Sequence, residues 1–285
     1  MAKYLPSETK AGLEKSEQAF RRALELNPDL ALAHKPYAQL EVDLGRAADA
    51  MARLIPRAQG SPDSELFAGL VSPLRYCGLL DASVAAHRRA TALEPKIRTS
   101  VPHTYFLQAD YTRLSHVRFD DFPYIAGIAL AELGRSAEAI AALKALEEKQ
   151  KTRIGDFARA ARTLIEGDHA GSIAAVQSIV SSNFSDPEGL YYLTRHLAHL
   201  AQAVPDLPGT AQTDAARADT ALDLFSRVVA GGFFSYPTIL HDPWLDPIRS
   251  HPRFTELLAQ VKSRFDEAAS TFASLNGSAI LHLTH

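Results

Sequence analysis

The feature that most limits how this chain can fold is a repeat of small, aromatic and proline residues. In the first copy, Ser16, Phe20 and Ala23 share one face of an expected helix, and a proline ends the copy. The prolines that end successive copies are 34 and 33 residues apart: Pro28, Pro62 and Pro95. A period of this size is typical of solenoids, in which each repeat buries its apolar face against the next.

A second regularity marks the turn inside each copy. A glycine stands five residues before the small position and follows an amphipathic stretch in four copies, and an alanine takes its place in the irregular one: Gly45, Gly78, Ala109, Gly134 and Gly167. Glycine ends helices at such places because it adopts a left-handed backbone conformation without steric cost. Small residues on the preceding stretches would let paired helices approach closely: Ala38, Gly127 and Ala160. We therefore expect an all-α fold of antiparallel helix pairs.

These residues resemble the tetratricopeptide repeat between about Leu13 and Arg227. The tryptophan of that pattern is absent, and its places hold other residues: His34, Phe67, Pro123 and Asp156. The resemblance implies a right-handed superhelical solenoid over residues 1–230. We expect an irregular pair near 96–119, with a shortened second helix. A loop insertion near 203–214 is expected between the helices Glu188–Gln202 and Ala215–Ala230.

Residues 231–285 differ from the repeats and are interpreted as a C-terminal capping segment. Its final amphipathic helix is expected from about Pro252 to Ala273. The runs Asp242–Arg249 and Pro252–Phe254 resemble the closing segment of tetratricopeptide-repeat arrays in bacterial signalling proteins, including serine/threonine kinases, nucleotide cyclases and winged-helix regulators. We expect Trp244 to close the open end of the last helix pair, in preference to a role as a recognition anchor.

Composition and charge exclude several classes of function. The net charge of -3 and the pI near 6.4 give no electrostatic footprint for nucleic acid or an anionic membrane. No apolar run approaches the roughly 18 to 20 residues that a membrane span needs. The single cysteine, Cys77, excludes an intrachain disulfide, and we expect it to be a packed thiol. These observations, with an N-terminus unlike a signal peptide, predict a cytoplasmic protein.

Motifs for catalysis or for a cofactor are missing from the sequence. It contains no glycine-rich phosphate loop, no G-x-S-x-G elbow and no H-E-x-x-H helix. We therefore expect no enzyme, no cofactor and no metal. His196 and His199 are three residues apart on an expected helix, which leaves a metal site as an alternative. A second group is better explained by aspartates that initiate turns: His241, Asp242, Asp246 and His251.

The resemblance implies that the first helices of successive pairs line a concave groove. The residues expected to face a partner there are Lys35, Gln39, Arg75, His103, Tyr124, Phe157, Tyr191 and Arg195. Aromatic rings with a few cations suit an extended segment held by stacking and charge-assisted hydrogen bonds. The alternative for each aromatic is packing between repeats. Some family members grip a terminal carboxylate, but Pro36 and Gln39 stand where that clamp would need asparagines.

Three functions follow as hypotheses. The first is a scaffold that binds a protein or peptide, as a docking or regulatory module of a bacterial signalling protein. The second is an enzyme or a protein that binds a small ligand or metal, with the superhelix as its pocket. The third is self-association, because the helix expected at Leu13–Leu26 has no clear first helix before it and would leave an apolar face for a second copy.

Overall fold

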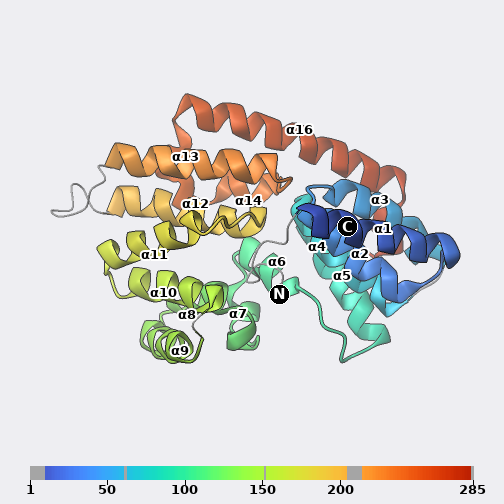
Figure 1. The fold of residues 1–285 in the computed structure, drawn as a ribbon, viewed down its shortest axis with the longest axis horizontal. Helices are drawn as coiled ribbons and strands as arrows, with labels where there is room; N and C mark the ends of the chain where they lie inside the picture. Colours follow the sequence, from blue (N-terminus) through green and yellow to red (C-terminus); the bar gives the residue numbers. More distant parts are fainter. Residues whose placement is uncertain (1–9, 61–62, 151, 204–213, 284–285) are drawn as a thin grey trace. The chain divides into compact units, whose positions relative to one another are not determined.

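The computed structural model describes residues 10–60, 63–150, 152–203 and 214–283. Every regular element in these residues is a helix (Figure 1), which confirms the predicted all-α class. The chain separates into two compact units. The described part of unit 1 contains residues 105–227 and 242–255, and that of unit 2 contains residues 10–104, 228–241 and 256–283. Within those described residues, no helix has the length and apolar composition needed to cross a membrane.

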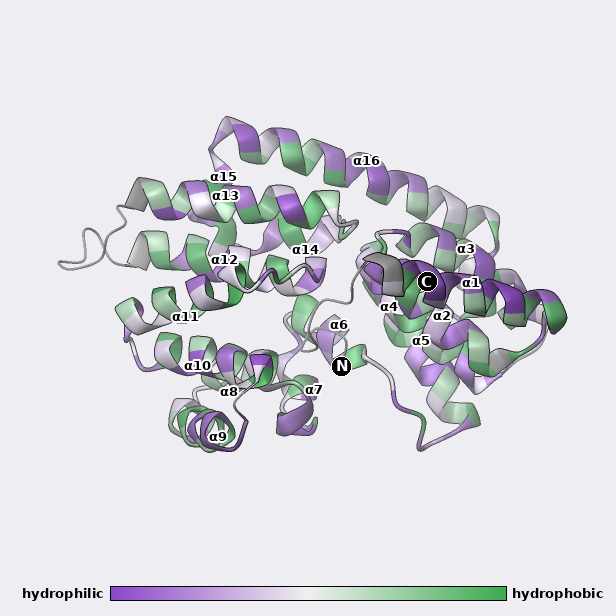
Figure 2. Ribbon diagram, viewed as in Figure 1, coloured by the Kyte–Doolittle hydropathy of each residue, from purple (hydrophilic) through white to green (hydrophobic). Residues whose placement is uncertain are grey.

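Unit 2 is built on consecutive packed helices. Helix α4 packs against α2, α3 and α5, and α2 also contacts α1 and α3. The helices of this unit are α1 (Lys10–Leu26), α2 (Ala31–Asp43), α3 (Ala47–Gly60), α4 (Ser64–Tyr76), α5 (Leu80–Leu93), α14 (Tyr236–His241), α17 (Gly277–Ile280) and most of α16 (Pro252–Ser274). The predicted final helix is thus confirmed, and along α16 hydrophobic and hydrophilic residues alternate with the helical turns (Figure 2).

Unit 1 has helix contacts of the same kind within itself. Helix α10 packs against α8, α9 and α11, and α11 packs against α12. Figure 1 shows α10, α11 and α12 following one another in chain order. The elements are α7 (Tyr111–Leu114), η2 (Phe119–Asp121), α8 (Pro123–Glu132), α9 (Ser136–Lys149), α10 (Arg153–Ile165), α11 (His169–Ser181), α12 (Pro187–Ala203), most of α13 (Asp214–Ala230), η3 (Pro243–Leu245) and α15 (Asp246–Arg249).

The turns predicted from the glycine pattern are present. Five residues have positive φ angles between 54° and 77° and follow the first helix of a pair: Gly45, Gly78, Ala109, Gly134 and Gly167. At the first of these turns, Gly45 donates to the carbonyl of Val42 at 2.9 Å and Arg46 donates to that of Glu41 at 2.7 Å. The other four turns have the same two bonds, which satisfy carbonyls at the helix end.

The irregular pair also has the expected form. Helix α6 (Val101–Leu107) is followed by the four-residue α7, and Ala109 between them has a φ of 54°. The helices on either side of the expected loop at 203–214 match their predicted ranges within a residue or so. The loop itself, residues 204–213, lies outside the described residues. Whether residues 231–285 form a separate capping segment stays a prediction.

Small residues permit close packing of paired helices, as expected. Ala38 and Ala160 are fully buried. At Gly127 in α8, an added Cβ would lie 2.8 Å from Cδ1 of Leu143 in α9, which is closer than carbon atoms approach without a shift. The whole stretch 123–130 of α8 is buried, so this helix forms the core of unit 1 beside α9 and α10.

Candidate functional site

The candidate site lies on one face of α12 in unit 1. The helix begins at Pro187, where proline is tolerated in the first turn, and the Asp186 carboxylate accepts a backbone N–H of that turn at 2.7 Å. Tyr191, Arg195 and His199 follow at intervals of four residues. This spacing places the three side chains on the same face of the helix.

Asp242, just before η3, meets this face through its carboxylate. Its Oδ2 lies 2.7 Å from Nε of Arg195, and its Oδ1 lies 3.3 Å from Nη2. The Tyr191 hydroxyl donates to Oδ2 at 2.6 Å. The backbone N–H of Trp244 donates to Oδ1 at 3.0 Å, so Asp242 also initiates the turn, as its place before a proline suggests. One carboxylate therefore fixes the start of η3 against α12.

The carboxylate of Asp242 stays charged inside the protein because Arg195 lies beside it. Burial alone would raise the pKa of Asp242, but the charge and hydrogen bonds of Arg195, with the bonds from Tyr191 and Trp244, hold it below its ordinary value. Burial raises the pKa of Tyr191 well above its ordinary value, and the Asp242 charge adds to that effect. Asp242 is therefore an anion and Tyr191 a neutral donor at neutral pH.

The third nitrogen of the Arg195 guanidinium, Nη1, is not bonded to Asp242, unlike Nε and Nη2. Nη1 is buried and makes no hydrogen bond with any described residue. The guanidinium carbon lies 4.0 Å from the centre of the Trp244 ring and 5.0 Å from that of Phe106. Tyr111 is also a neighbour: burial raises the pKa of Tyr111, and the charge of Arg195 and a side-chain hydrogen-bond interaction with Arg195 oppose that effect. Arg195 thus stands among aromatic rings with one donor group unsatisfied.

Trp244 connects the site to the surface. Its ring stacks on His199 with centroids 4.6 Å apart and an interplanar angle of 20°. Both side chains are half-buried, as is Tyr111. Burial lowers the pKa of His199, and the charge of Arg195 lowers it further. Trp244 therefore lies on α12, the first helix of the last predicted pair, with part of its ring exposed.

His196 occupies a separate, fully buried network. Ser172 Oγ lies 2.6 Å from its Nε2, and the Tyr124 hydroxyl lies 3.0 Å from its Nδ1. The Tyr124 hydroxyl also donates to the Tyr192 carbonyl at 3.2 Å. With the proton on Nδ1, His196 donates to Tyr124 and accepts from Ser172, which satisfies all three groups. Burial lowers the pKa of His196 to about 3, so its ring is neutral.

The surroundings of His196 and His199 do not favour the alternative in which both bind one metal ion. Both ring nitrogens of His196 contact hydroxyl groups, while His199 stacks on Trp244. Among the described residues, no three His, Cys, Asp or Glu side chains gather closely enough to hold a metal ion. Cys77 is fully buried, as expected for a packed thiol, and burial raises its pKa.

The residues expected to line a groove are mostly buried. In unit 1, Tyr124 and Phe157 pack edge to face with centroids 5.8 Å apart, beside the Tyr191–Arg195 face. The buried members are Arg75, His103, Tyr124, Phe157, Tyr191 and Arg195, with exposed fractions of 5% or less. Lys35 and Gln39 are half-buried and bind neighbours on unit 2: Lys35 pairs with Glu65 at 3.0 Å, and Gln39 donates to Asp43 at 2.8 Å.

Arg75 and His103 belong to unit 2 and are separate from the α12 site. Arg75 donates to the carbonyl and the hydroxyl of Ser100 at 3.2 and 3.0 Å. The structure therefore brings together only part of the expected set, around Tyr191 and Arg195. Sequence reasoning did not include Asp242, Trp244 and Tyr111 among the residues facing a partner. The one available signal is the Asp-Pro-Trp run, which turn chemistry explains equally well.

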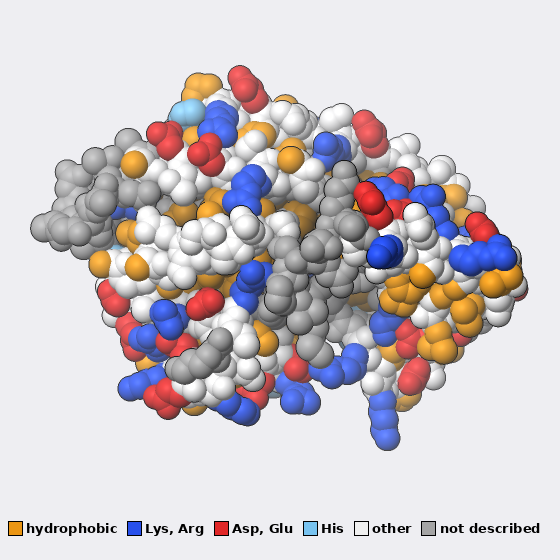
Figure 3. Space-filling model, viewed as in Figure 1, with side chains coloured by type: hydrophobic (Ala, Val, Ile, Leu, Met, Phe, Trp, Pro, Cys, Tyr) orange, Lys and Arg blue, Asp and Glu red, His pale blue; other side chains and the backbone are white. Residues whose placement is uncertain are grey.

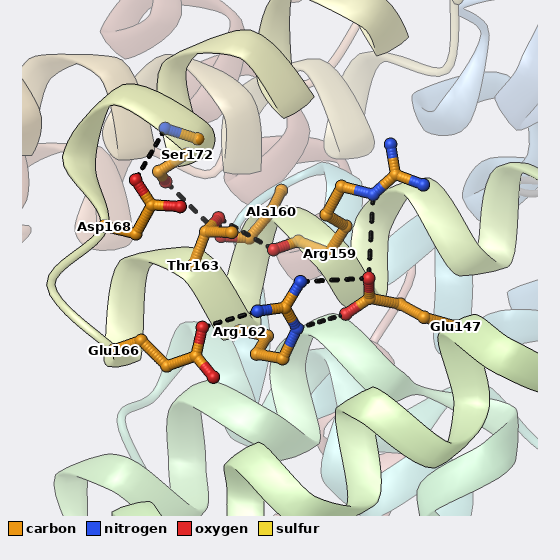
Figure 4. A network of polar contacts seen from close by, with 9 residues as sticks. Glu147, Arg159, Ala160, Arg162, Thr163, Glu166, Asp168 and Ser172 are labelled. Atoms are coloured by element: carbon orange, nitrogen blue, oxygen red, sulfur yellow. Dashed lines mark hydrogen bonds and ion pairs between the residues drawn. The ribbon is translucent and has the colours of Figure 1, made fainter.

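A second polar network of unit 1 lies at its α9–α11 side (Figure 4). Arg162 of α10 contacts Glu147 of α9 at 2.5 Å and Glu166 of its own helix at 2.5 Å. Arg159 lies 3.6 Å from the same Glu147 carboxylate. These groups are partly exposed and oppositely charged, so the network is explained by solvated ion pairs between neighbouring helices.

Comparisons of the sequence with protein-family models and with curated proteins find no match. The class of protein is therefore defined by its architecture: the described residues form consecutive packed helices, and five of the turns between them have a left-handed residue.

Proposed function

We propose that this chain is a tetratricopeptide-repeat protein whose helix pairs form a right-handed solenoid and whose first-helix face in unit 1 binds a protein or peptide. The support for the repeat is the recurrence of one turn. Five turns share a left-handed residue and the same pair of backbone hydrogen bonds, at the positions of the glycine pattern in the sequence. Such regularity is what repeated copies of one helix–turn–helix unit produce.

The observation that carries the binding role is the aromatic face around Arg195. Tyr111, His199 and Trp244 are half-buried there, so part of each ring is available to a partner. Tyr124 and Tyr191, which also neighbour Arg195, are fully buried. Aromatic side chains with a polar edge supply large contact area at a low entropic cost, which is why they are enriched at protein interfaces.

A selection from a displayed peptide library tests this proposal. Peptides selected on the wild-type protein are expected to bind a Trp244→Ala variant at least about tenfold more weakly, because a central aromatic anchor is removed. Arg135→Ala is the matched control, since Arg135 is exposed and its side chain pairs only with Glu138, in the helix that follows it, among the described residues. Equal affinity of the selected peptides for all three proteins, with intact folds, would contradict the proposal.

The resemblance of the closing segment to signalling proteins supports a docking or regulatory module as the setting of this binding. The geometry does not favour the alternative of an enzyme or a metal protein built on His196. Its ring is fully buried, is kept neutral by burial and has both nitrogens bonded to hydroxyl groups. A catalytic base must instead reach a substrate.

Self-association is a second candidate function, favoured by an exposed apolar edge in unit 2. Leu26, at the end of α1, is 70% exposed, and Leu32, at the start of α2, is 72% exposed. Figure 3 shows hydrophobic side chains gathered over this end of the two helices. Light scattering over a concentration series tests it. A dimer that is lost in a Leu26→Glu/Leu32→Glu variant supports self-association, and a wild-type monomer at all concentrations contradicts it.

A further inference from the structure

We infer that Nη1 of Arg195 donates a hydrogen bond to a carbonyl oxygen of the bound peptide, so that the site accepts an uncharged group in preference to a carboxylate. The inference rests on the peptide binding by unit 1 proposed above. It goes further by naming the atom that donates a hydrogen bond to the peptide and the chemical type of the group that accepts it.

The first step is the unsatisfied donor. Arg195 is 95% buried, given its exposed fraction of 5%, and its Nη1 has no hydrogen-bond partner among the described residues. Buried donors are almost always paired because an unpaired one has lost its water without compensation. Nε and one N–H of Nη2 already contact Asp242, and Nη1 is the one guanidinium nitrogen with no partner at all among the described residues.

The second step is charge. The Asp242 carboxylate already neutralises the guanidinium, and the surrounding groups Tyr111, Tyr191 and Trp244 add no second cation. A ligand carboxylate at Nη1 would stand near the Asp242 carboxylate in a poorly solvated place and would be repelled by it. The side-chain amide oxygen of Gln or Asn has no such penalty and accepts the same hydrogen bond.

The third step is access. The Arg195 guanidinium contacts Trp244 directly, and Trp244 stacks on His199, with both of these rings half-buried. Tyr111, another neighbour of the guanidinium, is also half-buried. The surroundings of the donor therefore reach the surface through these three partly exposed rings. A segment lying across these rings would bring its carbonyl groups toward Nη1.

Trp244 makes the test direct, because it is the single tryptophan of the chain and it lies against Arg195. The probes are three mixtures of capped hexapeptides, random except for one fixed residue, which is Gln, Glu or Lys. Their affinities are measured by the change in Trp244 fluorescence. The variant Arg195→Lys retains a cation for Asp242 but lacks the second branch of the guanidinium. Arg162→Lys is the matched control, since Arg162 is paired with Glu147 and Glu166.

The Gln mixture is expected to bind the wild type most tightly. Its affinity is expected to fall about threefold to tenfold in Arg195→Lys, the usual effect of one hydrogen bond, and to stay unchanged in Arg162→Lys. Tightest binding of the Glu mixture, or equal affinity of the Gln mixture for wild type and Arg195→Lys, would overturn the inference while leaving peptide binding intact. Absence of binding by every mixture would instead contradict the proposed function itself.

A measurement on the wild type covers the case in which Arg195→Lys does not fold. The guanidinium ¹⁵N–¹H signals of Arg195 are followed by NMR while the Gln mixture is added. A selective shift and slower exchange of the Nη1 protons is the expected result. Unchanged guanidinium signals at saturating peptide would overturn the inference.

Discussion

Arg195 of α12 and Asp242 before η3 form a buried ion pair, with Nε and Oδ2 2.7 Å apart although the residues are 47 positions apart in the sequence. Their side chains are 7% and 4% exposed. Such a pair holds two distant segments in one arrangement, because the loss of either partner leaves the other charge buried without compensation. It is the structural centre of the candidate site.

Removal of the carboxylate should therefore destabilise unit 1. We expect Asp242→Ala to lower the free energy of unfolding by about 3–5 kcal/mol, the usual cost of leaving a buried charge unpaired. Urea denaturation followed by circular dichroism measures this. The matched control is Asp246→Ala, whose exposed pair with Arg249 should contribute at most about 1 kcal/mol. Equal effects of the two substitutions would show that the buried pair does not hold the segment.

Stability should fall in mild acid because of His196. Its pKa is about 3 in the folded protein, against about 6.5 in an unfolded chain, so the unfolded state binds the proton more readily. The stabilisation is complete above about pH 6.5. Below that pH it decreases by about 1.4 kcal/mol for each pH unit as far as the folded pKa.

Unfolding free energies at several pH values between about 7 and 4 check this prediction. His34, His87 and His199 also have lowered pKa values, so they contribute to the same decrease. A His196→Gln variant isolates the contribution of His196, because the difference in stability between this variant and the wild type should shrink as the pH falls. A difference that is constant over this range would contradict the buried neutral histidine.

The left-handed turns predict opposite changes in stability for two substitutions, Gly134→Ala and Ala109→Gly. Gly134 has a φ of 75°, and a Cβ added there would have no other atom within 4 Å, so Gly134→Ala tests backbone strain alone. We expect a loss of about 1 kcal/mol. Ala109 has a φ of 54°, and Ala109→Gly should stabilise the protein by up to about 1 kcal/mol. Thermal melts of both variants check the two signs, and the same sign for both would contradict the turn geometry.

Local features of the fold were predictable from the sequence, and long-range features of the site were not. The turn at Gly45 is encoded by one residue and its helix, so a single position reveals it. Arg195 and Tyr191 were correctly placed on one face by their spacing. Their partner Asp242 lies 47 residues from Arg195, and no periodic pattern connects the two. The burial of Tyr124 follows from aromatic packing across α8, α10 and α12, which one helix alone does not reveal.

The histidines show the same limit. His196 and His199 are three residues apart, which suggests a shared site. On a helix this spacing still leaves an angle between the two side chains. His196 points to Tyr124 and Ser172 in the core, while His199 reaches Trp244. Only the packing of α12 against its neighbours decides between these environments.

Hydrogen exchange in the presence of a selected peptide tests the central claim most directly, namely that the Arg195 face of unit 1 is a binding surface. Backbone amides of α12 and of residues 242–249 should exchange more slowly when the peptide is bound, whereas those of α3 and α5 should be unchanged. Protection confined to unit 2, or no protection at saturating peptide, would contradict the claim.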